Sequence, residues 1–249
     1  MRYFFEIAYD GTNYHGWQVQ NNAITIQEVI TEKLRVIAKD DSLNILGCGR
    51  TDTGVHAKQF FFHVDLNINL DFNDVKYRLN NMLPSDIIIK CIFNVKENAH
   101  ARFDAIERTY RYYINLKKDP FSLNYSWYLN KEIDVKAMND ACVYLCEYED
   151  FTSFSKLHTD VKTNICKLKS AFWKNQDSHL IFEITADRFL RNMVRSIVGT
   201  MIDIGIKKMA ANEIHNIILS KNRSAAGASV PAKGLFLETI KYPSEIKMN

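Results

Sequence analysis

Hydrophobic and polar residues alternate along the first stretch of the chain and then change to a helical spacing. Over residues 2–10 the alternation predicts a strand with one apolar face. The residues of that face are Tyr3, Phe5, Ile7 and Tyr9. Thr25 and Glu28 then form a capping box, and the apolar stripe that follows predicts a helix. The stripe consists of Ile26, Val29, Ile30, Leu34 and Ile37.

The same change of period continues through the first half of the chain. Strands are predicted on either side of a glycine-rich stretch, and a helix and a further strand follow them. In order, these elements are strands at 43–46 and 60–66, a helix from Asp71 or Asn73 to about Met82, and a strand at 87–95. Pro84 ends the helix, because proline disrupts a helix interior. The order β-α-β-β-α-β is that of a ferredoxin-like unit.

The second half repeats this order and adds one short helix. The predicted elements are a strand at 108–116, a helix capped by Asp134, a hairpin of strands 162–173 and 179–187 around Asn175–Ser178, helices at 190–204 and 213–219, and a strand at 235–242. We therefore predict an α+β fold of two ferredoxin-like halves, 1–105 and 106–249, whose antiparallel sheets join around a central cleft. Segments without a regular period are predicted to be surface loops that contact ligand. They are 13–22, 150–164 and 221–233.

Composition and charge narrow the class of protein. The chain has 249 residues, 47% of them hydrophobic, which suits a folded protein with a substantial core. Residues 1–105 hold 11 Lys and Arg against 13 Asp and Glu, and residues 106–249 hold 21 against 16, so the halves carry −2 and +5. The basic second half is compatible with phosphate contacts to a nucleic acid, and equally with a basic face that meets only solvent.

Cysteine and histidine spacing argues against a metal site. The five cysteines form no Cys-x-x-Cys pair and the seven histidines form no helical pair, so we predict no disulfide framework and no metal. The N-terminus has no signal-peptide pattern, and no apolar run reaches membrane-spanning length. We therefore expect a cytoplasmic protein with no membrane partner.

The candidate chemistry centres on the stretch 47–57. It is rich in glycine, lies between two predicted strands and contains one carboxylate, Asp52, two residues after Arg50. Glycines at 47, 49 and 54 allow positive φ angles and a close approach of the backbone to a ligand. Such a turn presents Asp52 at the edge of a sheet. The alternative is that Asp52 only caps its own backbone beside a solvated arginine.

Residues 49–57, with the sequence GRTDTGVHA, resemble the signature of the tRNA pseudouridine synthase A family. Six further blocks resemble this family in the family's own order, so the similarity covers nearly the whole chain. They are 9–18 with Gln20, 83–87, 100–105, 108–112, Phe189 with 193–199, and 231–235. One departure is Gln59-Phe60, where the family pattern has Gly-Gln, and it leaves the local turn geometry open.

The resemblance implies the pseudouridine synthase fold and an isomerase that acts on tRNA. Its substrates would be uridines of the anticodon stem-loop, at tRNA positions 38, 39 and 40, and its assembly a homodimer. Uracil is detached at N1 and rejoined through C5, so the reaction loses no atom and requires no redox cofactor or energy donor. The resemblance makes Asp52 the nucleophile. A carboxylate can add to C1′ of the ribose or remove the C2′ proton and pass through a glycal, and both routes stay open.

The resemblance also assigns roles to four other residues. Arg195 is the cation that pairs with the catalytic aspartate, Arg50 takes part in base flipping, Tyr110 stacks on the uracil, and Leu235 lies below the ring. Residue chemistry alone leaves a structural alternative for each. Arg50 can form a local ion pair with Asp52, and Tyr110 and Leu235 can be packing residues.

Arg195 has its own alternative interpretation. With Arg188 and Arg191 it falls on one face of the predicted helix, at spacings of three and four residues. Such a trio is equally a solvated stripe opposite the apolar face. Tyr112, on the same strand face as Tyr110, is predicted to be core.

Two other classes of function compete with the isomerase. A non-catalytic RNA-binding protein of two RRM-like halves would show aromatic RNP motifs, which this sequence lacks. An aspartyl-phosphate enzyme would need a second acid near Asp52 to hold magnesium, and none is present.

Overall fold

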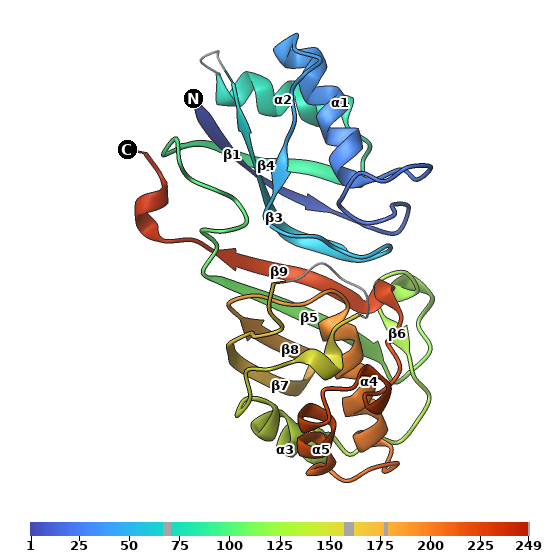
Figure 1. Ribbon diagram of the computed structural model, residues 1–249. Helices are drawn as coiled ribbons and strands as arrows, with labels where there is room; N and C mark the ends of the chain where they lie inside the picture. Colours follow the sequence, from blue (N-terminus) through green and yellow to red (C-terminus); the bar gives the residue numbers. More distant parts are fainter. Residues whose placement is uncertain (67–70, 157–161, 177–178, 249) are drawn as a thin grey trace. The chain divides into compact units, whose positions relative to one another are not determined.

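The computed structural model describes residues 1–66, 71–156, 162–176 and 179–248 (Figure 1). The fold is of the mixed α+β class. The chain divides into two compact units, the first formed by Met1–Ile106 with Leu237–Asn249 and the second by Glu107–Phe236. Of the helices in the described ranges, none is long and apolar enough to cross a membrane.

The first unit is built on a sheet whose first four strands pair antiparallel. Its strands are β1 (Arg2–Tyr9), β2 (Leu46–Gly47), β3 (His56–Asp65), β4 (Ile87–Val95) and the part of β9 (Leu235–Lys241) that belongs to this unit. Strand β1 lies between β4 and β3, and β3 also pairs with β2 and neighbours β9. The alternating apolar face predicted for residues 2–10 is buried, since Tyr3, Phe5 and Ile7 have no exposed surface.

Two helices cover one face of this sheet, α1 (Ile26–Ala38) and α2 (Phe72–Met82) (Figure 1). Both begin where the sequence predicts a cap. The Thr25 side chain accepts a hydrogen bond from the Glu28 amide, and the Asp71 side chain accepts from Asn73 and Asp74. These bonds satisfy amides that have no partner inside the helix.

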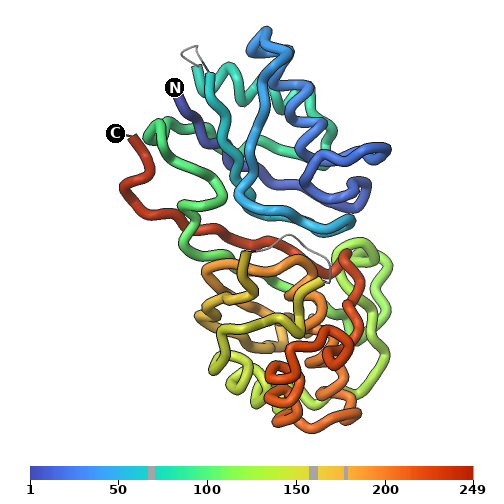
Figure 2. Tube along the Cα trace, viewed as in Figure 1, coloured from blue at the N-terminus to red at the C-terminus, as the bar shows by residue number. Residues whose placement is uncertain are grey.

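The end of the chain returns to the first unit. The Ile240 amide donates to Gln59 Oε1 at 2.9 Å, and the Tyr242 hydroxyl donates to the Ala101 carbonyl oxygen at 2.5 Å. Figure 2 shows this last segment beside the part of the chain around residue 100. The predicted halves divided the chain once, at 105, whereas these long-range bonds group 237–249 with the first unit. Gln59, the departure from the family pattern, lies within β3 and not in a turn.

The second unit contains a further set of adjacent strands, with helices packed beside them. Strands β5 (Glu107–Asn115), β8 (His179–Ala186) and β7 (Leu168–Gln176) are adjacent and antiparallel, and β6 (Trp127–Tyr128) runs parallel to β5. Helices α3 (Val135–Leu145), α4 (Met193–Gly205) and α5 (Glu213–Leu219) gather on one side of this sheet (Figures 1 and 2). Short 3-10 helices occupy 120–122, 152–154, 223–225, 232–234 and 244–246.

The predicted helix at 190–204 began too early. Helix α4 starts at Met193 because Asn192 has a φ of 65°, in the left-handed region, which interrupts the chain before the first turn. Arg188 and Arg191 therefore precede the helix, and the predicted helical face of three arginines is wrong. The predicted strand at 162–173 begins only at Leu168.

Parts of two other predictions lie outside the described residues. They are Asp177 and Ser178 of the predicted hairpin turn, and residues 157–161 of the predicted loop at 150–164. The strands that flank the turn pair directly, with Gln176 opposite His179.

His63 on β3 gives the first unit a pH-dependent stability. Its ring is buried, Nδ1 accepts the Ala101 amide proton at 3.2 Å, and burial lowers its pKa from 6.5 to about 4. Between these two values the unfolded chain binds a proton that the folded protein does not. Stability is therefore fully present above pH 6.5 and falls as the pH drops toward 4.

We expect His63→Gln to flatten this slope. Urea denaturation at several pH values between 4 and 7 measures it, with His15→Gln as the control because His15 is exposed. An unchanged slope in His63→Gln would contradict this assignment.

Candidate active site

The loop that carries Asp52 is anchored where it leaves β2. The Cys48 amide donates to the Phe61 carbonyl oxygen at 2.8 Å, and the Phe61 amide donates to Cys48 Sγ at 3.3 Å. Cys48 is 1% exposed, so its thiol is a packing group of this turn. These contacts place the next residues, beginning with Gly49, at the edge of β3.

The segment from Tyr9 to Trp17 holds the rest of the loop. The Tyr9 hydroxyl is 2.8 Å from Thr51 Oγ1, and the Trp17 amide donates to the Thr51 carbonyl oxygen at 3.3 Å. The Gly54 amide donates to the Tyr14 carbonyl oxygen at 3.2 Å. Bonds therefore hold the backbone on both sides of Asp52, whose side chain is half-buried.

The loop itself closes as a turn. The Val55 amide donates to the Asp52 carbonyl oxygen at 3.1 Å, and Gly54 has a φ of 74° within that turn. His56 follows as the first residue of β3 and is 1% exposed. Its Nδ1 lies 3.1 Å from the Gly11 amide nitrogen and 2.9 Å from Asp10 Oδ1. These contacts give His56 a structural role at the end of the loop.

Two glycines allow the segment 9–17 to approach this loop. A Cβ at Gly11 would lie 2.0 Å from the Val55 carbonyl oxygen, and one at Gly16 would lie 2.2 Å from the Thr51 carbonyl oxygen. Both neighbours are backbone atoms of the loop, so any side chain at these positions would displace the segment that presents Asp52. Gly16 also has a φ of 85°, which L side chains rarely adopt.

Asp86 fixes the other side of the segment. Its carbonyl oxygen accepts the Asp10 amide proton at 2.9 Å, and its Oδ1 accepts from the Tyr14 hydroxyl at 2.6 Å. Burial, and then the bond to the carboxylate, raise the pKa of Tyr14 above its usual value. Three sequence blocks that are far apart in the chain thus form one framework around Asp52. Nothing in the sequence pattern assigns Asp86 this anchoring role.

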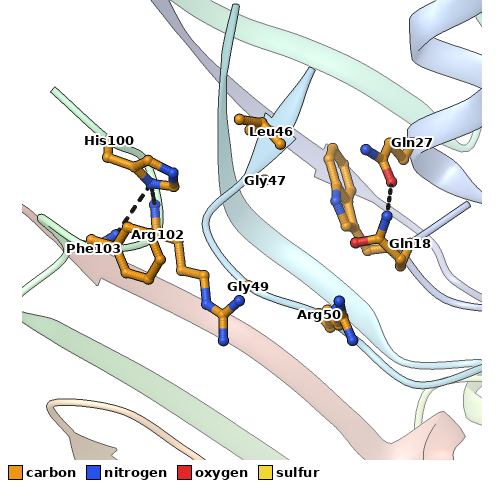
Figure 3. Close-up of a pocket in the computed structure, with 10 residues that line it drawn as sticks. Gln18, Gln27, Leu46, Gly47, Gly49, Arg50, His100, Arg102 and Phe103 are labelled. Atoms are coloured by element: carbon orange, nitrogen blue, oxygen red, sulfur yellow. Dashed lines mark hydrogen bonds between the residues drawn. The ribbon is translucent and has the colours of Figure 1, made fainter. Parts of the chain in front are cut away.

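Arg50 lines a pocket beside the same loop. The pocket has a volume of about 190 Å³, and its walls include Trp17, Gln18, His100 and Phe103 (Figure 3). The Arg50 side chain is exposed.

The second unit contains the other three candidates. Tyr110, on β5, is half-buried and packs edge-on against Phe189, with ring centroids 5.1 Å apart. Tyr112, on the same strand, has no exposed surface and donates from its hydroxyl to the Pro231 carbonyl oxygen at 2.8 Å, so its assignment to the core is confirmed. Burial raises the pKa of Tyr112, and the positive charge of Arg195 acts in the opposite direction.

Arg195 lies in the first turn of α4 and is half-buried. Its Nε donates to the Val230 carbonyl oxygen at 2.8 Å, and the Val230 amide donates back to the Arg195 carbonyl oxygen at 3.3 Å. With the bond from Tyr112 to Pro231, this ties α4 and β5 to the segment that leads into Leu235, which is 5% exposed. Arg195 is therefore bonded to the segment that precedes Leu235, although the two residues are 40 positions apart in the sequence.

A family model described as tRNA pseudouridine synthase matches residues 141–243. A tRNA pseudouridine synthase A of Bacteroides fragilis is 49% identical over 247 residues, which cover 98% of both chains. The chain belongs to the tRNA pseudouridine synthase A family. A relative of that name from Azobacteroides pseudotrichonymphae is 49% identical over 248 residues, covering 100% of this chain and 99% of the relative.

More distant members of this tRNA pseudouridine synthase family keep the same length. The protein of that name from Thermoanaerobacter sp. strain X514 is 35% identical over 238 residues, which cover 95% of this chain and 97% of the relative. Membership makes the chain an isomerase by class and disfavours the interpretation as a non-catalytic RNA-binding protein. No group of three or more His, Cys, Asp and Glu side chains that could hold a metal ion occurs within the ranges that the structure describes.

Proposed function

We propose that this protein converts uridines of the tRNA anticodon stem-loop to pseudouridine, with Asp52 as the catalytic carboxylate. The observation that carries the proposal is the framework around Asp52, whose loop is bonded on both sides to the segment 9–17. A carboxylate held in this way can meet a ribose without reorganising its loop, which lowers the entropic part of the barrier. Membership of the tRNA pseudouridine synthase A family supports the reaction.

The reaction breaks the bond from N1 to C1′ and forms a bond from C5 to C1′. In one route the Asp52 carboxylate adds to C1′ and leaves when C5 attacks that carbon. In the other route it removes the C2′ proton to give a glycal, and returns the proton when C5 attacks C1′. The proton on C5 departs at the end, and N1 gains one. Tyr110 is the group proposed to stack on the uracil and to move the C5 proton, and Leu235 is proposed to pack below the ring.

Asp52 must stay ionised to act, and we assign Arg195 as the cation that maintains its charge. The bond from Arg195 Nε to the Val230 carbonyl oxygen supports this role, because it restricts the guanidinium to one orientation. A guanidinium keeps its charge at every physiological pH, so its effect on a carboxylate does not vary.

Arg50 is proposed to assist base flipping. A uridine inside a stem must leave its stack, at a cost of a few kcal/mol, before its ribose can reach a catalytic group. The Arg50 side chain is exposed beside the Asp52 loop, where a planar guanidinium can replace lost stacking or bind phosphate.

Arg50→Ala should therefore slow modification most where the uridine is paired. We expect the rate of modification to fall about tenfold or more for a stem uridine, because the variant no longer offsets the few kcal/mol that unstacking costs. The rate should fall less when the same uridine is unpaired. Single-turnover rates on two RNAs that differ only in the opposing strand measure this. Equal losses on both RNAs would show that Arg50 acts on another step.

Three further properties complete the proposal. Both units are proposed to be ferredoxin-like, which is supported by the order β4-β1-β3 with β2 on β3 and by two helices on one face of the first unit. A homodimer and a cytoplasmic location are proposed from the family resemblance.

One experiment tests the activity directly. The purified protein is incubated with unmodified tRNA transcripts, and pseudouridine is mapped by carbodiimide labelling and primer extension. We expect modification confined to the anticodon stem-loop. Pseudouridine elsewhere would overturn the proposed specificity, and its absence from every transcript would overturn the proposed function.

A further inference from the structure

The pocket beside Arg50 lies wholly within the first unit and is formed by residues from four parts of the chain, one of them Gln27 of α1. Gly47, Gly49 and Arg50 come from the entry to the Asp52 loop, and Trp17 and Gln18 come from the segment that holds that loop. His100, Arg102 and Phe103 form the opposite wall (Figure 3). The role of this second wall is not explained by the proposed reaction of a single uridine.

The charge of the pocket differs from that of the unit around it. Two arginines line it, Arg50 and Arg102, and none of the described residues that line it is an Asp or a Glu. Residues 1–105 as a whole carry a formal charge of −2. Figure 3 shows the two arginine side chains with the Gly49 backbone between them. A local pair of guanidinium groups in an otherwise acidic unit favours an anionic ligand. A guanidinium binds phosphate, as it binds carboxylate, with two parallel hydrogen bonds.

Phe103 supplies an aromatic surface next to these charges. It is 72% exposed, although burial of a phenylalanine side chain away from water is favourable. The backbone beneath it is fixed, because His100 Nδ1 accepts the amide protons of Arg102 at 3.1 Å and Phe103 at 3.4 Å. The His100 ring also packs against Phe103, with centroids 4.3 Å apart. Phe103 is therefore a supported side chain that presents its ring to solvent.

His100 is itself held in a neutral form. It lies edge-on to the His63 ring with centroids 4.6 Å apart, and burial lowers its pKa below the usual value. Because its Nδ1 accepts hydrogen bonds, the proton of the neutral ring is on Nε2. The positive charge of the pocket at neutral pH thus comes from the two arginines.

We propose that this pocket binds the nucleotide next to the uridine that is isomerised, with its base stacked on Phe103 and its phosphate held by Arg50 and Arg102. The inference rests on the proposed function. A volume of about 190 Å³ is below that of sites that enclose a whole small molecule, so it fits one part of a longer polymer. Arg50 is two residues from Asp52, a Cα separation of at most about 7 Å, so the bound nucleotide is a near neighbour of the target.

The pocket gives Phe103 and Arg102 a positioning role. Holding a neighbouring nucleotide fixes the backbone on one side of the target, so that the extruded uridine reaches the catalytic carboxylate in one orientation. Stacking on an aromatic side chain accepts any base, so this subsite adds affinity and alignment without selecting a sequence.

The test combines a change in the protein with a change in the RNA. Phe103→Ala should weaken binding of the tRNA roughly 5- to 150-fold, the effect of losing one stacked base. A tRNA with an abasic site at the neighbouring position should bind wild-type protein with a similar loss. Both changes remove the same contact. The Phe103→Ala protein should therefore bind the abasic tRNA no more weakly than either change alone would predict, so the two losses of binding free energy are not additive. Abasic sites on the 5′ and 3′ sides of the target are each tested, and we expect one of them to behave in this way.

Matched variants separate this contact from a general effect. Tyr77→Ala removes an aromatic ring that is 70% exposed on α2 of the same unit, and it should leave tRNA binding unchanged. Phe103→Tyr keeps the ring and should retain binding, which excludes a loss of folding as the cause. The logarithm of the tRNA binding constant falls linearly with the logarithm of the salt concentration. Arg102→Gln should reduce this slope by about one, the release of one counterion, whereas Arg78→Gln on α2 should leave it unchanged.

The outcomes distinguish this inference from the proposed function. If wild-type protein forms pseudouridine but Phe103→Ala binds as tightly as Tyr77→Ala, the inference is overturned and the proposed function stands. Additive losses from Phe103→Ala and from the abasic site on both sides of the target would also overturn it. If wild-type protein forms no pseudouridine, the proposed function itself fails.

Discussion

Asp52→Asn should abolish pseudouridine formation. The substitution keeps the size of the side chain and most of its hydrogen bonding, but it removes the charge and the nucleophilic oxygen. Loss of the single nucleophile or base of an enzyme lowers the chemical rate on the order of 10⁴-fold or more. Single-turnover assays with excess protein over tRNA measure this step without interference from product release.

The same variant should still fold and bind tRNA. The loop bonds described above are made by backbone atoms and by the side chains of Tyr9, Cys48, Thr51 and His56, all of which Asp52→Asn leaves in place. Thermal unfolding and tRNA binding should therefore stay close to those of the wild-type protein. Asp41→Asn, an exposed carboxylate in another loop of the first unit, is the matched control and should keep full activity. A folded Asp52→Asn variant that modifies tRNA at the wild-type rate would defeat the assignment.

Gly16→Ala should impair both stability and catalysis. An alanine Cβ would lie 2.2 Å from the Thr51 carbonyl oxygen, and the φ of 85° at this position is unfavourable for any L side chain. The backbone strain alone costs about 1–3 kcal/mol, and the clash displaces the residue next to Asp52. A shift of about 1 Å in a catalytic group lowers the rate by about 10²-fold, so we expect kcat to fall by that order. Thermal unfolding and steady-state kinetics measure the two effects.

Gly49→Ala provides the control for stability. A Cβ at this position meets no atom within 4 Å, and the residue does not have a positive φ. Its free energy of unfolding should change by less than about 0.5 kcal/mol, as for most surface substitutions. Equal destabilisation by the two alanines would show that the contact of Gly16 with the loop is not the cause. A Gly16→Ala variant that loses stability but keeps kcat would show that the position of Asp52 does not depend on this contact.

Local sequence patterns were sufficient for most of the secondary structure. The period of apolar residues and the caps at Thr25, Asp71 and Asp134 are short-range properties, since each cap bonds an amide within three residues. The strand over Ile87–Val95 and the short helix Glu213–Leu219 have the predicted bounds. The start of helix α4 was predicted three residues too early. The pattern of apolar residues does not indicate that Asn192 adopts a left-handed backbone conformation.

Local sequence patterns do not predict the separate roles of the three glycines in the Asp52 loop. The sequence alone attributes positive φ or close approach to all three. Gly54 does have a positive φ, and a Cβ at Gly47 would lie 2.5 Å from Trp17 Nε1, but Gly49 has neither constraint and borders the open pocket. Which role a glycine has depends on what packs against it, and that partner is distant in the sequence.

The sequence by itself determined the family, the order of the elements and Asp52 as the candidate catalyst, because motifs and periodicity are read from neighbouring residues. Only the tertiary structure decided that Tyr14 and Asp86 join in the framework of the loop, that residues 237–249 belong with the first unit, and that Arg102 and Phe103 face Arg50 across one pocket. Each of these relations joins residues more than thirty positions apart. The physical reason is that hydrogen bonding, stacking and charge depend on distance in space, which strand pairing and helix packing set and which no local pattern encodes.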